Sequence, residues 1–270
     1  MVRMFHALLF GALVLMASPA RAESLNIAAA SSMRFVLPLV IEHYQSQHPT
    51  ADIRVVYGSS GRLYGQLSHG APFHIFMSAN MKYAEQLLAN NNAVGNVQAY
   101  ADGRLAFWWQ GAQSHVSTAD ILVAILAQPR GRIAIASPQH APYGVQSLAW
   151  LQQHEQWAVI EPRLVYTESV AQVAHFVRSG AASVGILALA LAVTDELASE
   201  GQYLLIPPHE YQPLRKGMVI TQAGSKHPYA AEFFAYMQTP AVRRILEQGG
   251  FASVTGLEAA SPNQQQALTQ

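Results

Sequence analysis

The sequence contains no cysteine among its 270 residues, and only 12% of its residues carry a charge. Without cysteine there is no disulfide framework, no thiolate metal site and no acylated cysteine to anchor a lipoprotein. Basic and acidic residues are equal in number, sixteen of each, and the basic ones form no cluster. We therefore expect no nucleic-acid partner, because binding to nucleic acid requires concentrated positive charge.

Long apolar runs are also missing, since none approaches the roughly 18 residues of a membrane-spanning helix. The N-terminus holds a shorter run: Arg3 precedes the apolar stretch Leu8–Met16, and small residues follow in Ala20-Arg21-Ala22. This pattern is typical of a secretory signal peptide. We predict that residues 1–22 are removed and that the mature chain, from Glu23, is a periplasmic protein without a membrane anchor.

Short apolar runs of strand character alternate with segments of helical periodicity, which is typical of βα units on a mostly parallel sheet. Strands are expected at Leu25–Ala29, Ile53–Tyr57, Ile75–Met77, Leu105–Trp109, Arg132–Ile135, Arg163–Tyr166, Ser183–Leu187 and Met218–Thr221. Helices are expected at Met33–Gln47, Gly61–His69, Met81–Asn90, Ala119–Ala127, Gly144–Gln153, Val170–Ser179, Pro228–Met237 and Ala241–Gln248.

Two segments are suited to carry the chain between two lobes. Tyr100–Arg104 enters a very apolar strand, and Ile206–Arg215 holds three prolines that disfavour helix and stiffen the path. We therefore predict a two-lobed α/β fold, each lobe a mostly parallel sheet flanked by helices, with a hinge and a central cleft. The predicted parts are lobe I (23–103 plus 208–251), lobe II (104–207) and a partly disordered C-terminal tail (252–270).

Serines follow two of the predicted strands at the points where helices begin. The first junction is Ala28-Ala29-Ala30-Ser31-Ser32, and the second is Gly58-Ser59-Ser60-Gly61, where glycine permits close backbone approach. A helix N-terminus presents unpaired N–H groups and a partial positive charge, so such a junction binds an anion without lysine or arginine. Ordinary capping explains the first junction alone, but two junctions at neighbouring strand ends indicate one crevice.

Two further helix starts belong to the other predicted lobe. Ser137–Gly144 is a rigid turn that leads into a helix, and Thr167–Val170 again precedes a helix. Each of them alone is compatible with a capped helix start. Four such starts, two from each lobe, predict an oxyanion held between opposed helix N-termini.

Taken in order, these segments resemble the periplasmic molybdate-binding proteins from about Ser24 to Phe251. The segments that carry the resemblance are Ala28-Ala29-Ala30-Ser31-Ser32, Gly58-Ser59-Ser60-Gly61, Gly70–Ala79, Ala141-Pro142-Tyr143-Gly144, Glu168-Ser169-Val170-Ala171-Gln172 and Gly185-Ile186-Leu187. The resemblance implies a two-lobed type II periplasmic binding protein. It also implies capture of molybdate or tungstate and delivery to the membrane permease of an ABC transporter, by a chain that we expect to be a monomer without a cofactor.

The resemblance also implies the residues that contact the oxyanion, through hydroxyls and backbone N–H groups and without a direct protein ligand to molybdenum. They are Ser31, Ser32, Ser60, Tyr143 and Val170. Many relatives carry a tyrosine at the position of Ala188, so this sequence lacks that hydroxyl and resembles the branch that places it at Tyr143. We expect Arg62 to be peripheral and Glu168 to face away from the ligand.

Other functions receive weaker support from the sequence. Sulfate remains an alternative ligand, because helix starts and hydroxyls do not set the size of the cavity. The eleven histidines show no metal-binding spacing, and we expect most of them to lie at the surface. A serine-dependent enzyme is less favoured, because Ser59 and Ser60 do not lie in a Gly-x-Ser-x-Gly motif and no partner histidine and acid stand out. A ferric site usually uses paired tyrosines, and Tyr143 has no adjacent tyrosine.

Overall fold

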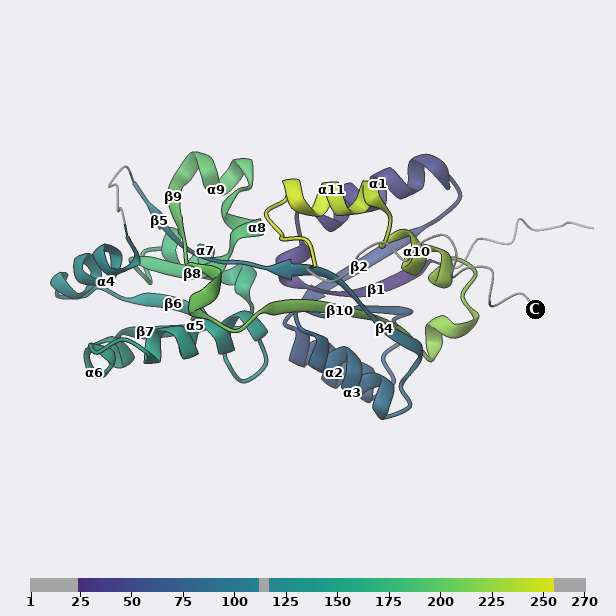
Figure 1. Ribbon diagram of the computed structural model, residues 1–270, viewed down its shortest axis with the longest axis horizontal. Coiled ribbons are helices and arrows are strands. Elements are labelled where there is room, and N and C mark those ends of the chain that lie inside the picture. The colour runs from purple at the N-terminus through teal and green to yellow at the C-terminus, as the bar shows by residue number, and fades with distance from the viewer. Residues whose placement is uncertain (1–23, 112–116, 255–270) are drawn as a thin grey trace, which may run out of the picture.

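The computed structural model describes residues 24–111 and 117–254, which form two lobes arranged end to end (Figure 1). Each lobe is built on one five-stranded sheet flanked by helices, as the sequence predicts. The predicted signal peptide, 1–22, lies outside the described residues, as does 255–270 within the predicted tail.

The two sheets share one topology although the sequence shows no internal repeat. Lobe I has the strand order β2-β1-β3-β10-β4, and lobe II has the order β7-β6-β8-β5-β9. The strands of lobe I are β1 (Leu25–Ala30), β2 (Ile53–Gly58), β3 (Ile75–Met77), β4 (Ala93–Gly103) and β10 (Leu214–Thr221). Those of lobe II are β5 (Leu105–Gln110), β6 (Ile133–Ala136), β7 (Leu164–Thr167), β8 (Val184–Ala188) and β9 (Gly201–Leu205).

Both sheets are mixed, because a strand that arrives from the other lobe is inserted beside the edge strand. In lobe I, β1 pairs in parallel with β2 and β3, whereas β10 is antiparallel to β3 and β4. In lobe II, β6 pairs in parallel with β7 and β8, whereas β5 is antiparallel to β8 and β9. The three parallel strands of each lobe therefore end at one edge of the sheet, where ligands bind in open α/β folds.

Lobe I has a separate apolar core on each face of its sheet, because successive side chains of a strand point to opposite faces. Ile27 and Ala29 of β1 join the core on one face, and Ala28 between them joins the core on the other. The helices of lobe I are α1 (Leu37–Gln47), α2 (Ser60–Ser68), α3 (Met81–Ala89), α10 (Ala230–Tyr236) and α11 (Pro240–Gln248). Figure 1 shows α1 and α11 on the opposite side of this sheet from α2 and α3.

Lobe II is organised around the apolar strand β5. Phe107 and Trp108 are fully buried and Trp109 is almost so, and all three belong to the core of lobe II. The helices of lobe II are α4 (Thr118–Ala127), α5 (Pro142–Gln152), α6 (Trp157–Ile160), α7 (Val170–Arg178), α8 (Leu189–Ala192) and α9 (Asp195–Glu200).

The chain passes between the two sheets at two places. Arg104 is the single residue between β4 and β5, and residues 206–213 connect β9 to β10. The second connection includes the short 3-10 helix Pro208–Glu210. Strands at the ends of these connections lie side by side, since Leu214 pairs with Gly103 and Ala106 pairs with Leu205.

Several elements differ from those that the sequence predicts. The helix expected at Met33–Gln47 is a 3-10 turn, Ser31–Met33, followed by α1 from Leu37. Pro38 lies in the first turn of α1, where its missing N–H costs no helical hydrogen bond. Strands β4 and β9 and the short helices α6, α8 and α9 were not predicted. Ala252, placed in the predicted tail, forms a β-bridge with Asp102.

Candidate functional site

The four predicted strand-to-helix junctions meet in one pocket between the lobes. Lobe I contributes the ends of β1, β2 and β3 with the starts of the 3-10 turn and α2, and lobe II contributes the starts of α5 and α7. The lining residues are Ala30, Ser31, Ser32, Gly58, Ser59, Ser60, Ala79, Ala141, Pro142, Tyr143 and Val170. All five predicted contact residues are among them, and the part of the lining that the structure describes includes no carboxylate, lysine, arginine or histidine.

The helix starts at this pocket lack the side-chain caps that four other helices of the described chain have. Helices α3, α4, α9 and α11 each begin with a side-chain oxygen that accepts a hydrogen bond from a first-turn N–H. Ser59 at the start of α2 and Ser169 at the start of α7 stand at the same N-cap position but make no such bond, and Ala141 before α5 has no side-chain acceptor. Neither Ser59 nor Ser169 therefore caps its helix through its side chain.

The serines of lobe I are buried and oriented. Ser31, Ser32, Ser59 and Ser60 are at most 5% exposed. The Ser60 hydroxyl oxygen accepts a hydrogen bond from the Ala79 N–H at 2.9 Å, so its own hydrogen remains available for an acceptor in the pocket. The Ser59 hydroxyl is buried and has no hydrogen-bond partner among the described residues.

Tyr143 supplies the phenolic group of the pocket from lobe II. Its side chain is 1% exposed, and its hydroxyl has no partner of good geometry among the described residues. Burial raises the pKa of Tyr143 well above its usual range, Tyr211 adds to the rise, and the nearby Ser32 hydroxyl offsets part of it. The group is therefore a neutral phenol near pH 7 and is able to donate a hydrogen bond. An unpaired buried hydroxyl costs about 1–3 kcal/mol, which a bound acceptor would recover.

Val170 and Ala188 occupy different places in lobe II. Val170 is the first residue of α7 and lines the pocket at the helix start. Ala188 is the last residue of β8, is fully buried and does not line the pocket. The departure at Ala188 thus leaves Tyr143 as the phenolic donor among the lining residues.

Two contacts join the lobes beside the pocket. The Gly61 N–H of α2 donates to the carbonyl of His140 in lobe II at 2.8 Å. Arg62 pairs with Glu168 at 2.8 Å, and both side chains are about half exposed, at 55% and 48%. Arg62 and Glu168 are therefore engaged with each other beside the pocket.

A larger and more charged cavity adjoins the pocket, and we call it the outer cleft. It shares Ser31 and Gly58 with the pocket. Its charged and titratable lining residues are Arg34, Tyr57, Glu168, His175, Arg178 and Glu196. The ionic groups of this region thus lie in the outer cleft, while the described lining of the inner pocket is neutral.

Lys216 lies near the site, but no sequence pattern pointed to it. It lies in β10, is fully buried, and its ammonium group donates to the Ser32 hydroxyl at 2.7 Å. Ser32 and Lys216 are separated by 184 residues in the chain. Within Leu214-Arg215-Lys216-Gly217, nothing in the sequence distinguishes a buried lysine from one exposed to solvent.

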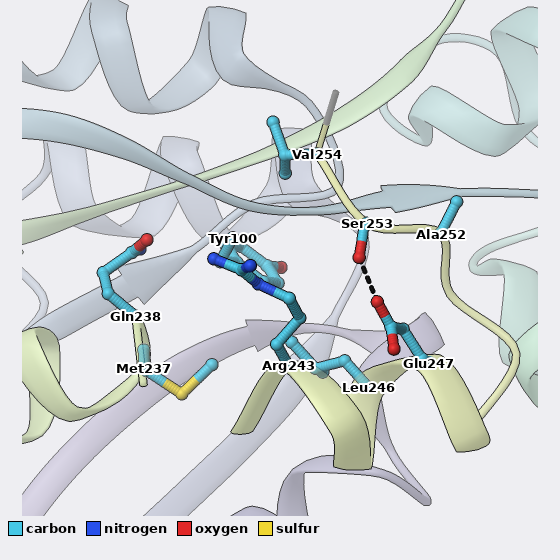
Figure 2. Close-up of a pocket in the computed structure, with 9 residues that line it drawn as sticks. All are labelled: Tyr100, Met237, Gln238, Arg243, Leu246, Glu247, Ala252, Ser253 and Val254. Atoms are coloured by element: carbon cyan, nitrogen blue, oxygen red, sulfur yellow. Dashed lines mark hydrogen bonds between the residues drawn. The ribbon is translucent and has the colours of Figure 1, made fainter. Parts of the chain in front are cut away.

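Another pocket, at the C-terminal side of lobe I, has a different chemistry. Figure 2 shows that its nine labelled residues come from β4, α11 and the segments beside that helix. Ser253 donates there to Glu247, whose carboxylate shares the pocket with Arg243. It contains none of the predicted contact residues.

The histidines do not form a metal site among the residues that the structure describes, where no group of three His, Cys, Asp or Glu side chains is placed to hold an ion. Two of the described histidines are nevertheless buried. His74 and His227 are 5% and 6% exposed, and their rings stack with centroids 4.3 Å apart.

Comparison with known proteins identifies the family. The family described as bacterial extracellular solute-binding protein matches residues 25–252. The chain belongs to this family of solute-binding proteins. Within the described parts of this solute-binding protein, no helix has the length and apolar character to cross a membrane.

Two relatives of this solute-binding protein have names that state a ligand. The molybdate-binding protein ModA of Azotobacter vinelandii is 28% identical over 240 residues, which cover 88% of this chain and 93% of the relative. ModA of Rhodobacter capsulatus is 28% identical over 202 residues, covering 74% and 77%.

Solved structures confirm the two-lobed binding-protein fold. The periplasmic molybdate-binding protein of Azotobacter vinelandii matches with a TM-score of 0.75 and 28% identity, over 86% of this chain and 100% of that one. The sulfate-binding protein SubI of Mycobacterium tuberculosis matches with a TM-score of 0.72 over 86% of this chain and 88% of that one. Because SubI is only 13% identical to this chain, this match shows a common fold and nothing more.

Proposed function

We propose that this protein captures molybdate, or the similar oxyanion tungstate, between its two lobes and delivers it to the membrane permease of an ABC transporter. The observation that carries the proposal is the inner pocket, in which uncapped helix starts and buried hydroxyls converge from both lobes. Helix N-termini and hydroxyls together donate hydrogen bonds to an anion from several directions. The names of the 28% identical relatives add molybdate as the ligand.

Ligand capture follows from the contribution of both lobes to one pocket. An anion that bonds to Ser60 of lobe I and Tyr143 of lobe II contacts both lobes only when they are closed. Because a ligand shifts an equilibrium by its differential affinity for two states, such an anion favours the closed form. The closed form is then the species that docks on the permease. We propose that the mature chain does this as a periplasmic monomer.

The ligand is tested by adding molybdate, tungstate, sulfate and phosphate separately to the purified mature chain. We expect molybdate and tungstate to raise the melting temperature most, because a ligand that binds only the folded state stabilises it by mass action. Isothermal calorimetry then gives each affinity and a stoichiometry of one. A stronger effect of sulfate would assign the protein to sulfate instead, and no effect of any oxyanion would contradict the proposal.

A further inference from the structure

The ammonium group of Lys216 is enclosed by groups that do not neutralise it. The side chain is 0% exposed, and its nitrogen lies 5.1 Å from the ring centroid of Tyr143 and 5.0 Å from that of Phe251. Among the described residues, the Ser32 hydroxyl is its hydrogen-bond acceptor, and no carboxylate is within ion-pair distance. An ammonium group has three donors, and the contact with Ser32 uses one of them.

The charged and titratable groups around Lys216 come from each element packed against it. Asp102 of β4 is the acid that acts on it, but Arg215 already binds this carboxylate through two nitrogens at 3.1 and 3.2 Å. The other titratable groups nearby are phenols, Tyr143 beside the ammonium and Tyr100 and Tyr211 beside Tyr143. Burial raises the pKa of each of them, so they are neutral near pH 7.

We propose that Lys216 is a positioning residue for the oxyanion: it holds Ser32 as a donor to the anion and places a positive charge directly behind the pocket. This inference rests on the proposed oxyanion-binding function. Because the Lys216 ammonium donates to the Ser32 oxygen, this contact does not use the hydrogen of the Ser32 hydroxyl. Ser32 lines the pocket, so this hydrogen is available to an anion bound there. A dianion in the pocket would supply the negative charge that the buried ammonium lacks.

The inference makes binding depend on pH in a defined direction. Burial lowers the pKa of Lys216 from 10.5 to about 7 in the ligand-free protein, and Asp102 opposes part of this fall. A bound dianion favours the charged ammonium and therefore raises this pKa. Below about pH 6 the lysine is charged with or without ligand, and affinity is constant. Above pH 7 the ligand must bind together with a proton, so affinity falls as pH rises.

The wild-type protein tests this inference without any substitution. Molybdate binding is measured by calorimetry between pH 6 and 9, at each pH in two buffers with different enthalpies of ionisation. We expect the affinity to fall by up to about tenfold per pH unit above pH 7, with uptake of a fraction of a proton at pH 8. Constant affinity and no proton uptake, in a protein that does bind molybdate, would overturn the inference and leave the proposed function standing.

A variant pair separates the charge of Lys216 from a structural role. Lys216→Met keeps a linear apolar side chain between the two rings and removes the charge and the donor. We expect it to bind molybdate about tenfold or more weakly at pH 6 and to lose the pH dependence. Lys226→Met is the matched control, since Lys226 is exposed, and it should keep both the affinity and its slope with pH.

The melting temperature of each variant shows whether it folds. If Lys216→Met does not fold, proton uptake by the wild-type protein decides the question alone. If it folds and retains the wild-type pH dependence, the inference is wrong. If the wild-type protein binds no oxyanion at any pH, the proposed function itself fails, and the inference fails with it.

Discussion

The inner pocket and the outer cleft lie next to each other but use opposite chemistry. The pocket is lined by buried serines, one phenol and helix starts, whereas the outer cleft carries half-exposed ionic groups such as Glu168 and Arg178. Exposed ion pairs contribute about 0–1 kcal/mol because water and salt screen them. Hydrogen bonds to a charged group in a dry pocket contribute more, about 1.5–3 kcal/mol. The affinity for an anion should therefore come from the neutral pocket.

The sharpest test of this comparison is the choice between molybdate and phosphate. Near neutral pH hydrogen phosphate carries a proton that needs an acceptor, and the pocket lining holds no carboxylate. An acid hydrogen left unpaired in a site built from donors is strongly rejected. We expect calorimetry at pH 7 to show phosphate binding at least about 100-fold more weakly than molybdate. Phosphate within tenfold of molybdate would mean that the site includes an acceptor.

The next largest effect is expected from Ser60→Ala. Its hydroxyl is buried and already oriented by the Ala79 N–H, so its loss removes one donor to the anion. We expect molybdate affinity to fall about tenfold or more, since a hydrogen bond to a charged group contributes about 1.5–3 kcal/mol. Ser225→Ala, at an exposed position, is the control. Unchanged affinity for Ser60→Ala would remove Ser60 from the contact residues.

Tyr143→Phe tests the phenolic donor of lobe II. The substitution keeps the ring that packs beside Lys216 and removes only a hydroxyl that has no partner of good geometry among the described residues. We expect affinity to fall by about 1–3 kcal/mol without loss of ligand-free stability, as measured by calorimetry and thermal melting. Tyr203→Phe on an exposed strand position should change neither. If Tyr143→Phe binds normally, the N–H groups near Tyr143 and Val170 are the lobe II contacts.

The smallest effect is expected from Arg62→Ala in the ionic rim. Arg62 pairs with Glu168 across the lobes, so its removal weakens the closed form slightly. We expect a loss below about 1 kcal/mol at low salt, which disappears in about 1 M salt. Arg54→Ala removes a similarly exposed arginine that pairs with Asp52 within lobe I, and it should leave affinity unchanged. A loss for Arg62→Ala as large as that for Ser60→Ala would mean that the exposed ionic rim, and not the buried pocket, dominates recognition.

Much of the fold is predictable because buried strands have continuous apolar runs. The strand predicted at Ile75–Met77 agrees with β3, and Leu105–Trp109 agrees with β5 to within one residue. The edge strand β4 was missed because it is partly exposed and contains Gly95 and Asn96, which weaken a strand pattern. The edge strand β9 likewise alternates only weakly between buried and exposed positions.

Less of the candidate site than of the fold is predictable from the sequence. Serines after strands indicate a helix start, but a sequence does not distinguish a serine that caps its helix from one that leaves the N–H groups open. That distinction needed the geometry of Ser59 and Ser169. The contact between Lys216 and Ser32 spans 184 residues and depends on the insertion of β10 beside β3 and β4. No local pattern carries this information.

The close approach at Gly61 sets a geometric limit on how far the cleft can shut. A side-chain carbon at this position would lie 2.9 Å from the Cα of His140 and 2.8 Å from the Tyr83 hydroxyl, whereas ordinary contacts between carbon atoms are about 3.5–4.0 Å. A methyl group at this position would therefore prevent the two lobes from closing completely. This variant would keep every hydrogen-bond donor to the anion but would not enclose the anion completely. The dissociation rate constant of the ligand would therefore rise, while its association rate constant would stay unchanged.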